Sequence, residues 1–241
     1  MRILTIDIEN RPNLAYVWGL WDQNVGLTQL VEAGETISFA AKWHGSKKVE
    51  FYSVHHHGKD EMLAQAHRLL SEADVVVGYN SKNFDMKHLN KEFILAGMLP
   101  PVPYSQVDLL NVARQQFKFP SNKLDYVAQA LGLGSKTSHT GFDLWVRCMA
   151  GEDKAWSLMR KYNKQDVVLT EKLYDKLLPW IKSHPSVPLH DGNRNDACTN
   201  CGSEDLKRDG YAMTNVGKYQ RYQCRDCGKY LRSGKRIDGV D

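Results

Sequence analysis

Two carboxylates stand two residues apart near the start of the chain, in the stretch ILTIDIEN at residues 3–10. Side chains alternate between the faces of a strand, so Asp7 and Glu9 project together while apolar residues fill the opposite face. Like charges at this spacing repel unless cations lie between them, and hard oxygen ligands suit Mg²⁺ or Mn²⁺. The stretch predicts either a metal site or a strand that ends at Ile8 with both carboxylates in solvent.

Two later stretches supply further candidates. In GYNSKNFDMKHL a buried strand is expected to end at Gly78, and Asp85 falls in the first turns of the following helix. There it serves either as a helix cap or as part of a site at the carboxyl end of the strand. In RKYNKQDVVLTEKLY, Tyr162 and Asp166 share one helical face, roughly 5–6 Å apart at Cβ, as a site pair or an exposed pair.

These residues in this order resemble the three motifs of the DEDD 3′→5′ exonucleases: Asp7, Glu9, Asp85, Tyr162 and Asp166. The stretch from Asn80 to Asp85 reads N-x-x-x-F-D, as in the second motif. With a tyrosine in the third motif, the set resembles the DEDDy branch. It is similar to the proofreading exonuclease domains of family B DNA polymerases and to their stand-alone, DnaQ-like relatives. The resemblance covers roughly residues 1 to 180. It implies an α/β, ribonuclease-H-like fold, with helices on both faces of a mixed five-stranded sheet.

The same resemblance implies roles for these residues around two Mg²⁺ or Mn²⁺ ions, which activate a water and stabilise the leaving oxygen of a phosphodiester. Asp7 would bridge both ions. Glu9 and Asp166 would hold the ion that activates water, and Asp85 would support the other through water. Tyr162 would orient the attacking water, because a phenol with a pKa near ~10 is a poor base at neutral pH.

Three residues are candidates for contact with the terminal nucleotide. Asn80 and Phe84 match the flank of the second motif, although a turn residue and a core aromatic would look the same. Asn10 departs from the family pattern, because many relatives carry threonine after the Asp-x-Glu pair. An amide can still donate hydrogen bonds, so Asn10 stays among the substrate-binding candidates.

Four cysteines near the C-terminus form two Cys-x-x-Cys pairs separated by 22 residues: Cys198, Cys201, Cys224 and Cys227. This spacing is typical of one structural Zn²⁺ held by four thiolates, and the segment resembles a zinc ribbon. Tyrosines alternate with Lys and Arg after residue 218, a pattern that can stack bases and neutralise phosphates. A ribbon that docks protein is the alternative.

Hydrophobic periodicity predicts the elements that carry these residues. Strands are expected near residues 2–8, 36–42, 49–54, 74–80 and 102–110, and helices over 60–73, 81–98 and much of the stretch up to residue 181. Asp108 is predicted to cap a helix, and His55 to His57 to form a loop rather than a metal site. Residues 12–34 have no assigned shape. The predicted domains are 1–182, a linker at 183–197, and the ribbon at 198–241.

Composition narrows the class of protein. The 241 residues carry a formal net charge of +4, with nine Lys or Arg against six Asp or Glu after residue 197. A secretory signal and an apolar run long enough to span a membrane are both absent from the sequence, which favours a cytoplasmic protein without a membrane partner. In that compartment, paired cysteines are more often metal ligands than disulfides.

The function expected from these features is removal of nucleoside monophosphates from the 3′ end of single-stranded DNA, in proofreading or repair, with a DNA polymerase or replisome as a candidate partner. Two alternatives stay open. One is a 3′→5′ exoribonuclease that trims RNA, since recognition of the 2′-hydroxyl depends on details of a pocket. The other is a non-catalytic module that binds nucleic acid or a replisome.

Overall fold

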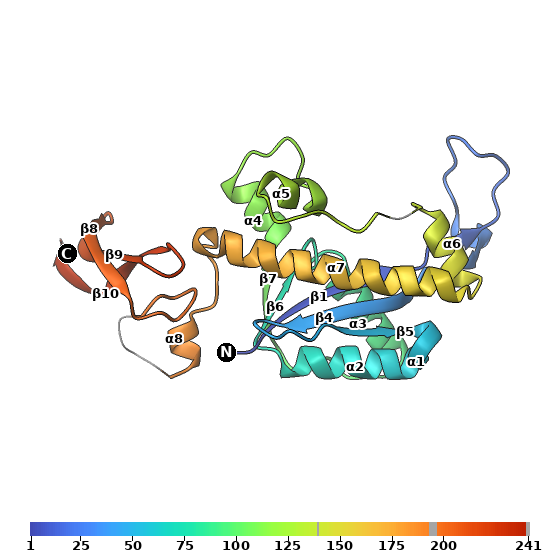
Figure 1. The fold of residues 1–241 in the computed structure, drawn as a ribbon, viewed down its shortest axis with the longest axis horizontal. Helices are drawn as coiled ribbons and strands as arrows, with labels where there is room; N and C mark the ends of the chain where they lie inside the picture. The colour runs from blue at the N-terminus through green and yellow to red at the C-terminus, as the bar shows by residue number, and fades with distance from the viewer. Residues whose placement is uncertain (139, 193–196, 240–241) are drawn as a thin grey trace.

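A mixed five-stranded sheet organises the N-terminal part of the computed structural model, which describes residues 1–138, 140–192 and 197–239 (Figure 1). The strand order is β5-β4-β1-β6-β7. The strands are β1 (Ile3–Asn10), β4 (Thr36–Trp43), β5 (Glu50–Ser53), β6 (Val75–Gly78) and β7 (Ser105–Asp108). β4 pairs antiparallel with β1 and β5, whereas β6 pairs parallel with β1 and β7. The predicted mixed sheet is confirmed.

Helices cover both faces of this sheet, as predicted (Figure 1). α2 (Lys59–Glu72) and α3 (Asp85–Leu95) pack on one face, and α4 (Leu109–Gln116), α5 (Leu124–Ala130) and α7 (Asp153–Leu177) on the other. Strand β6 lies between both layers, with Val76 in the first core and Val75 and Val77 in the second. Burial on both faces explains why β6 is a continuous apolar run. A further helix, α6 (Asp143–Met149), packs beside α7.

The loop predicted at His55 to His57 is wrong, because these residues belong to the short helix α1 (Val54–His57). Ser53 starts the helix: its hydroxyl accepts a hydrogen bond from the backbone N–H of His56 at 3.2 Å. Serine is a favoured N-cap because it satisfies a backbone donor that the first turn leaves unpaired. This local cap, rather than side-chain periodicity, produces the helix.

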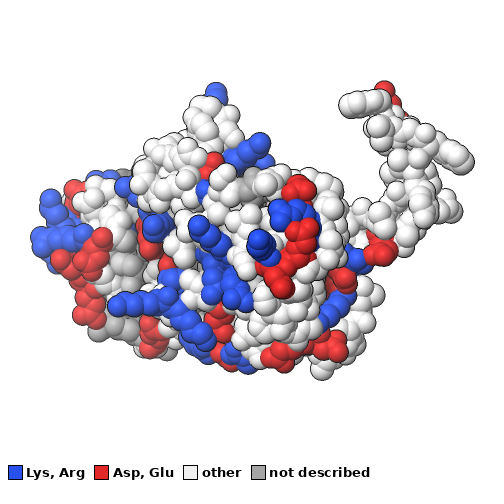
Figure 2. Space-filling view, turned by 45° about the vertical axis from the view of Figure 1, so that its right-hand side comes forward, with Lys and Arg blue, Asp and Glu red and all other residues white. Residues whose placement is uncertain are grey.

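Residues 12–34 form an arm that extends away from the body of the protein (Figures 1 and 2). Its two sides are the strands β2 (Leu14–Ala15) and β3 (Leu30–Glu32), joined through a 3₁₀ turn, η1 (Leu27–Gln29). At the base, Lys91 Nζ donates to the carbonyl oxygen of Gly34 at 2.7 Å, and Arg11 forms ion pairs with Glu32 and Glu35. The base is therefore fixed to the body.

The C-terminal part is a separate three-stranded antiparallel sheet of β8 (Leu206–Met213), β9 (Gly217–Cys224) and β10 (Tyr230–Gly239). The segment predicted as a linker includes a short helix, α8 (Val187–His190), which its lack of periodicity did not predict; residues 193–196 lie outside the described residues. The domain boundaries stay a prediction.

The cysteine-bearing turns of this part hold the C-terminal end of α7 and the 3₁₀ turn η2 (Leu178–Trp180) that follows it. Asn200 Nδ2 donates to the carbonyl oxygens of Leu178 at 2.7 Å and Ile181 at 2.9 Å. Lys229 Nζ donates to Ile181 O at 2.8 Å. These bonds satisfy carbonyl groups that the end of a helix leaves unpaired. Across the described ranges, no helix has the length and apolar character to cross a membrane.

Candidate functional site

Strand β1 brings the first two carboxylates to the centre of the sheet. Leu4, Ile6 and Ile8 are all buried on one face, so Asp7 and Glu9 project from the other, beside α7. In the described structure β1 pairs with β6 only as far as Thr5. It therefore runs past the end of β6, and its last residues face the start of α3.

Asp85 fills the gap that β6 leaves. It is the first residue of α3 and is buried, and its Oδ1 accepts a hydrogen bond from the backbone N–H of Ile8 at 3.0 Å. The N-cap of α3 is Phe84 rather than Asp85. Of the two roles that the sequence left open, the geometry therefore favours a position at the carboxyl end of the strands over a helix cap.

The turn between β6 and α3 is held by Asp108. Its carboxylate accepts hydrogen bonds from the backbone N–H of Asn80 at 2.9 Å and of Lys82 at 3.2 Å. It also accepts from Leu110 N at 3.0 Å, which confirms the predicted cap of α4. Asn80 has a φ of 64°, a conformation that asparagine tolerates better than most residues. These contacts make Asn80 part of the turn that aims Asp85 at β1.

The long helix α7 supplies the remaining residues of the family pattern. Tyr162 and Asp166 lie one turn apart and are both buried. Between them, Asn163 Nδ2 donates to Asp7 Oδ2 at 2.7 Å and to Asp7 O at 3.1 Å. The sequence analysis missed Asn163. Its position three residues before Asp166 puts it on the same helical face, but only the packing of α7 on β1 gives it a partner.

Carboxylate oxygens of Asp7, Glu9 and Asp166 all lie within 4.8 Å of one another, in a group that could hold a metal ion. Asp85 approaches from the edge of β1 that β6 leaves open and does not belong to that group of three. Asp166 Oδ1 is buried and has no hydrogen-bond partner among the described residues. A buried, unpaired carboxylate oxygen is costly, and a divalent cation would satisfy it. The donor set, all hard oxygen, fits Mg²⁺ or Mn²⁺.

A lysine that the sequence analysis did not single out reaches into this group. Lys136 Nζ lies 2.5 Å from Asp166 Oδ2 and 3.2 Å from the Tyr162 hydroxyl. Burial is the largest single influence and lowers the pKa of Lys136, but the charges of Asp166, Tyr162 and Asp7 and the hydrogen bond to Asp166 together outweigh it, so the net pKa is raised. Lys136 lies in a glycine-rich loop without periodicity, so no sequence signal linked it to the carboxylates.

Burial and mutual repulsion dominate the electrostatics of the site. Burial, followed by the charges of Asp85 and Glu9, raises the pKa of Asp7 well above its ordinary value. Burial and Asp166 raise the pKa of Glu9 to about 8. Burial raises the pKa of Asp85 to about 7, although its bond from Ile8 N–H opposes the shift. Resistance to ionisation in the absence of cations is the behaviour expected of an acidic metal site.

We expect Lys136→Met to destabilise the metal-free protein by about 2–4 kcal/mol at pH 8, because it leaves buried carboxylates without their cation. The loss should shrink near pH 5, where most of these carboxylates are protonated. Urea unfolding without added Mg²⁺, Mn²⁺ or chelator measures both values. Lys172→Met, on an exposed lysine of α7, is the control and should change the free energy of unfolding by less than about 0.5 kcal/mol. Equal losses at both pH values would contradict the assignment.

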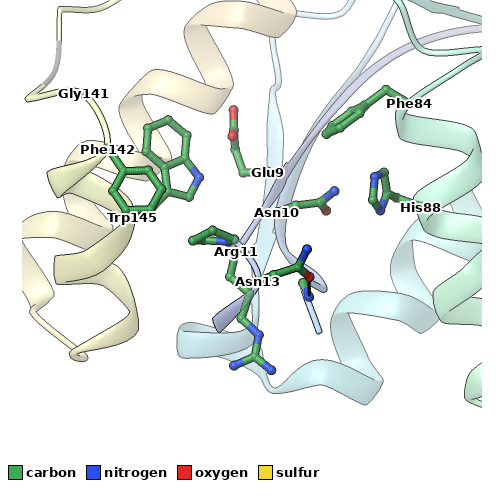
Figure 3. A pocket seen from close by; sticks show the side chains of 11 residues that line it. Glu9, Asn10, Arg11, Asn13, Phe84, His88, Gly141, Phe142 and Trp145 are labelled. Atoms are coloured by element: carbon green, nitrogen blue, oxygen red, sulfur yellow. Dashed lines mark hydrogen bonds between the residues drawn. The ribbon is translucent and has the colours of Figure 1, made fainter. Parts of the chain in front are cut away.

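A pocket of about 570 Å³ opens beside Glu9 (Figure 3). Phe84 and His88 of α3 line one side, and Phe142 and Trp145 line the other. Asn10 lies between the two sides. Flat aromatic walls on either side of a cavity of this size suit a planar ring such as a nucleobase.

Three polar atoms of pocket-lining residues are buried and lack hydrogen-bond partners among the described residues: Asn10 Nδ2, His88 Nδ1 and Arg11 Nε. Of the three, Arg11 Nε has an ion-pair partner, Glu35 at 3.2 Å. The Asn10 amide is oriented by the hydroxyl of Thr36, which donates to its Oδ1 at 2.9 Å. Of the three substrate-binding candidates, Asn10 and Phe84 line the pocket and Asn80 does not. His88 and Trp145 are additional lining residues that the sequence analysis missed.

The four C-terminal cysteines converge as their spacing predicted. The sulfur atoms of Cys198, Cys201, Cys224 and Cys227 lie within 4.8 Å of one another, with Cys198 and Cys227 Sγ 3.5 Å apart. Four thiol groups at these separations fit tetrahedral Zn²⁺. The fifth cysteine, Cys148, is buried in the core between α6 and α7.

Cations cover tyrosine rings on the C-terminal sheet. The Arg232 guanidinium lies 3.9 Å from the Tyr219 ring centroid, and Lys218 Nζ lies 4.1 Å from that of Tyr211. The sequence predicted interleaved aromatic and basic residues, and the fold pairs them across strands. Such a surface offers both positive charge and π-faces.

Comparisons with known proteins agree with the fold. A model of the RNase_H superfamily matches residues 26–178, more than half of the chain. That range includes Asp85, Tyr162 and Asp166 and begins after Asp7 and Glu9. Among solved structures, the family B DNA polymerase from the hyperthermophilic archaeon Pyrobaculum calidifontis is similar, with a TM-score of 0.57 and 17% identity. The match covers 89% of this chain and 31% of that chain, and at this identity it shows the fold alone. No match was found among curated proteins.

Proposed function

This chain belongs to the RNase_H superfamily, and from that premise we propose that it is a metal-dependent 3′→5′ exonuclease of the DEDDy type, acting on single-stranded DNA ends. The observation that carries the proposal is the convergence of Asp7, Glu9 and Asp166 within 4.8 Å, beside the buried Asp85. Mutual repulsion of these carboxylates opposes their ionisation, and bound divalent cations would offset that repulsion.

Asp7, Glu9, Asp85 and Asp166 would hold two Mg²⁺ or Mn²⁺ ions. When bound, these ions supply a hydroxide nucleophile and neutralise charge on the leaving oxygen. Asn163 orients Asp7 through the bond to Oδ2. Burial, then the charge of Glu9, raises the pKa of Tyr162, so its hydroxyl stays protonated and can orient a water by donating a hydrogen bond.

The aromatic pocket beside Glu9 would receive the terminal nucleotide of a strand. Its walls can stack on a base, and Asn10 Nδ2 would donate to an oxygen or ring nitrogen of that nucleotide. The C-terminal sheet, with its exposed cations, would bind phosphates further along the strand. A single-stranded end fits this arrangement, because a base must leave the duplex to be stacked between side chains.

Incubation with 5′-labelled single- and double-stranded DNA and RNA, in Mg²⁺ or Mn²⁺, tests the proposal. We expect a ladder that shortens stepwise from the 3′ end of single-stranded DNA, with nucleoside monophosphates released. Asp7→Ala and Asp166→Ala should both abolish it. Faster degradation of RNA would replace the DNA substrate with RNA, and binding without a ladder on any substrate would favour a non-catalytic module.

Phe84→Ala should raise KM for short single-stranded DNA by roughly tenfold, because loss of one base–aromatic contact costs about 1–3 kcal/mol. Phe84 is 42% exposed, so the free energy of unfolding should change little. Initial rates across substrate concentrations measure the effect. Tyr126→Ala removes an aromatic of similar exposure, 40%, that does not line the pocket, and should leave KM unchanged. An unchanged KM in Phe84→Ala would exclude this stacking role.

A further inference from the structure

The arm at residues 12–34 exposes more large apolar side chains than the proposed nuclease function explains. Trp18 is 99% exposed, and Leu20, Trp21 and Leu27 are each more than 80% exposed. Exposed patches of this kind mark interaction sites, and tryptophan is among the residues that dominate binding energies at protein interfaces.

The charge of the arm argues against nucleic acid as its partner. Residues 12–34 contain two acidic residues, Asp22 and Glu32, and no Lys or Arg. Single-strand binding surfaces combine stacking aromatics with cations that neutralise phosphates, and the arm offers no such cation. The space-filling view shows the arm as a largely uncharged projection (Figure 2). A protein surface that is apolar and basic would complement it.

The chain itself carries such a surface along the outer face of α3. A cavity of about 600 Å³ lies there, lined by Phe93, Ile94, Met98 and Pro100 together with Lys87 and Lys91. Ile94 and the neighbouring Leu99 are 75% and 81% exposed. The groove thus combines an apolar floor with positive charge, the two properties that would complement the apolar and acidic arm.

Each of the two surfaces carries one charged side chain for which no ion pair is found among the described residues. Asp22 near the tip of the arm and Lys87 at the edge of the groove are both exposed. Within the described part of the chain, neither forms an ion pair. Lys91, by contrast, is already occupied by Glu92 and by the carbonyl of Gly34 at the base of the arm.

We propose that two copies of this chain form a dimer in which the arm of each copy, through Trp18, Leu20 and Trp21, docks into the α3 groove of the other, with Asp22 beside Lys87. The base of the arm is fixed to α3 by Lys91, and the tip extends away from the body (Figure 1). The tip therefore does not cover the groove of its own copy. Because the base and the groove adjoin the same helix, reciprocal exchange places both contacts around one two-fold axis.

Sedimentation velocity of the full chain over a range of concentrations tests the proposal. The wild type should reach a dimer, and the double variant Trp18→Ser/Leu20→Ser should stay monomeric. Met213→Ser is the matched control, since Met213 is 71% exposed on the C-terminal sheet, and it should remain dimeric. A wild type that is monomeric at every concentration would overturn the proposal.

Charge reversal identifies the surfaces in contact. Asp22→Lys and Lys87→Asp should each raise the dimer dissociation constant by roughly two- to thirtyfold, because each pair contributes about 0.2–1 kcal/mol and occurs twice in the dimer. The variant with both substitutions should recover wild-type dimerisation. Failure of that recovery would exclude this docking. Loss of single-stranded DNA binding in Trp18→Ser/Leu20→Ser, with no change in mass, would assign the arm to nucleic acid instead. None of these outcomes depends on nuclease activity.

Discussion

Replacing Asp7 by asparagine should abolish phosphodiester hydrolysis and, without divalent metal, make the folded protein more stable. The amide oxygen of asparagine can still accept the hydrogen bond from Asn163 Nδ2, so the packing of α7 on β1 is preserved. The negative charge that would hold metal is lost, and we expect the rate to fall roughly a thousandfold or more, as for loss of a principal catalytic group. Gel-resolved initial rates on labelled single-stranded DNA measure this loss.

The stability change has a sign that depends on pH. The folded pKa values of these carboxylates are raised, to about 8 for Glu9 and about 7 for Asp85, so the folded state binds protons more tightly than the unfolded state. Their contribution is fully favourable below the unfolded pKa values, near ~4, and is lost as pH rises through the folded values. Asp7→Asn removes one of the repelling charges. Its advantage over wild type should be on the order of 1–2 kcal/mol at pH 8 and small at pH 4, where the cluster is protonated in both proteins.

Urea unfolding at the two pH values, without added Mg²⁺, Mn²⁺ or chelator, measures this advantage. Mn²⁺ should then raise the unfolding midpoint of the wild type more than that of Asp7→Asn, because only the wild type has the complete set of ligands. Glu72→Gln is a control that should lower stability at pH 8 rather than raise it, because hydrogen bonding from Arg68 lowers the pKa of Glu72. Lower stability of Asp7→Asn than wild type at pH 8 would mean that the Asp7 carboxylate stabilises the fold without metal, and that repulsion within the cluster is not the dominant effect.

The elements around the site were predictable where one physical rule acts locally. Alternation in ILTIDIEN placed Asp7 and Glu9 on one face, and four-residue spacing placed Tyr162 beside Asp166. The strand VVVG was recognisable because burial on both faces requires a continuous apolar run. The mixed sheet is confirmed on these grounds, and the roles of the site residues remain a proposal.

What the sequence did not predict depends on contacts between distant segments. Lys136 meets Asp166 only because the loop before α6 folds back over α7, and Asn163 meets Asp7 only because α7 packs on β1. His88 faces the pocket because α3 begins at Asp85. The shape of the arm was not predicted for a different reason. Its apolar residues are exposed, so an analysis that assumes buried apolar side chains assigns it no secondary structure.

Substituting Cys224 by serine should release zinc and unfold the C-terminal sheet while the five-stranded sheet persists. Structural zinc in small motifs contributes about 10–16 kcal/mol of apparent binding free energy, and a unit of this size has few buried apolar residues to replace it. Zinc analysis should give one ion per chain for wild type and close to none for the variant. Hydrogen exchange should become fast in β8, β9 and β10 and stay slow in β1 and β6.

The consequence extends to the helix that carries Tyr162 and Asp166. Asn200 and Lys229 occupy the two cysteine-bearing turns and bind the carbonyls of Leu178 and Ile181, so unfolding of the turns leaves the end of α7 without its caps. Exchange should therefore rise in the last turn of α7 but not around Asp166, about three helical turns away. Cys148→Ser is the control, since that thiol is buried between α6 and α7 and far from the cysteine group, and zinc content should be unchanged. An unchanged zinc content in Cys224→Ser would exclude the four-thiolate zinc site. The bonds from Asn200 and Lys229 would then have no reason to depend on metal.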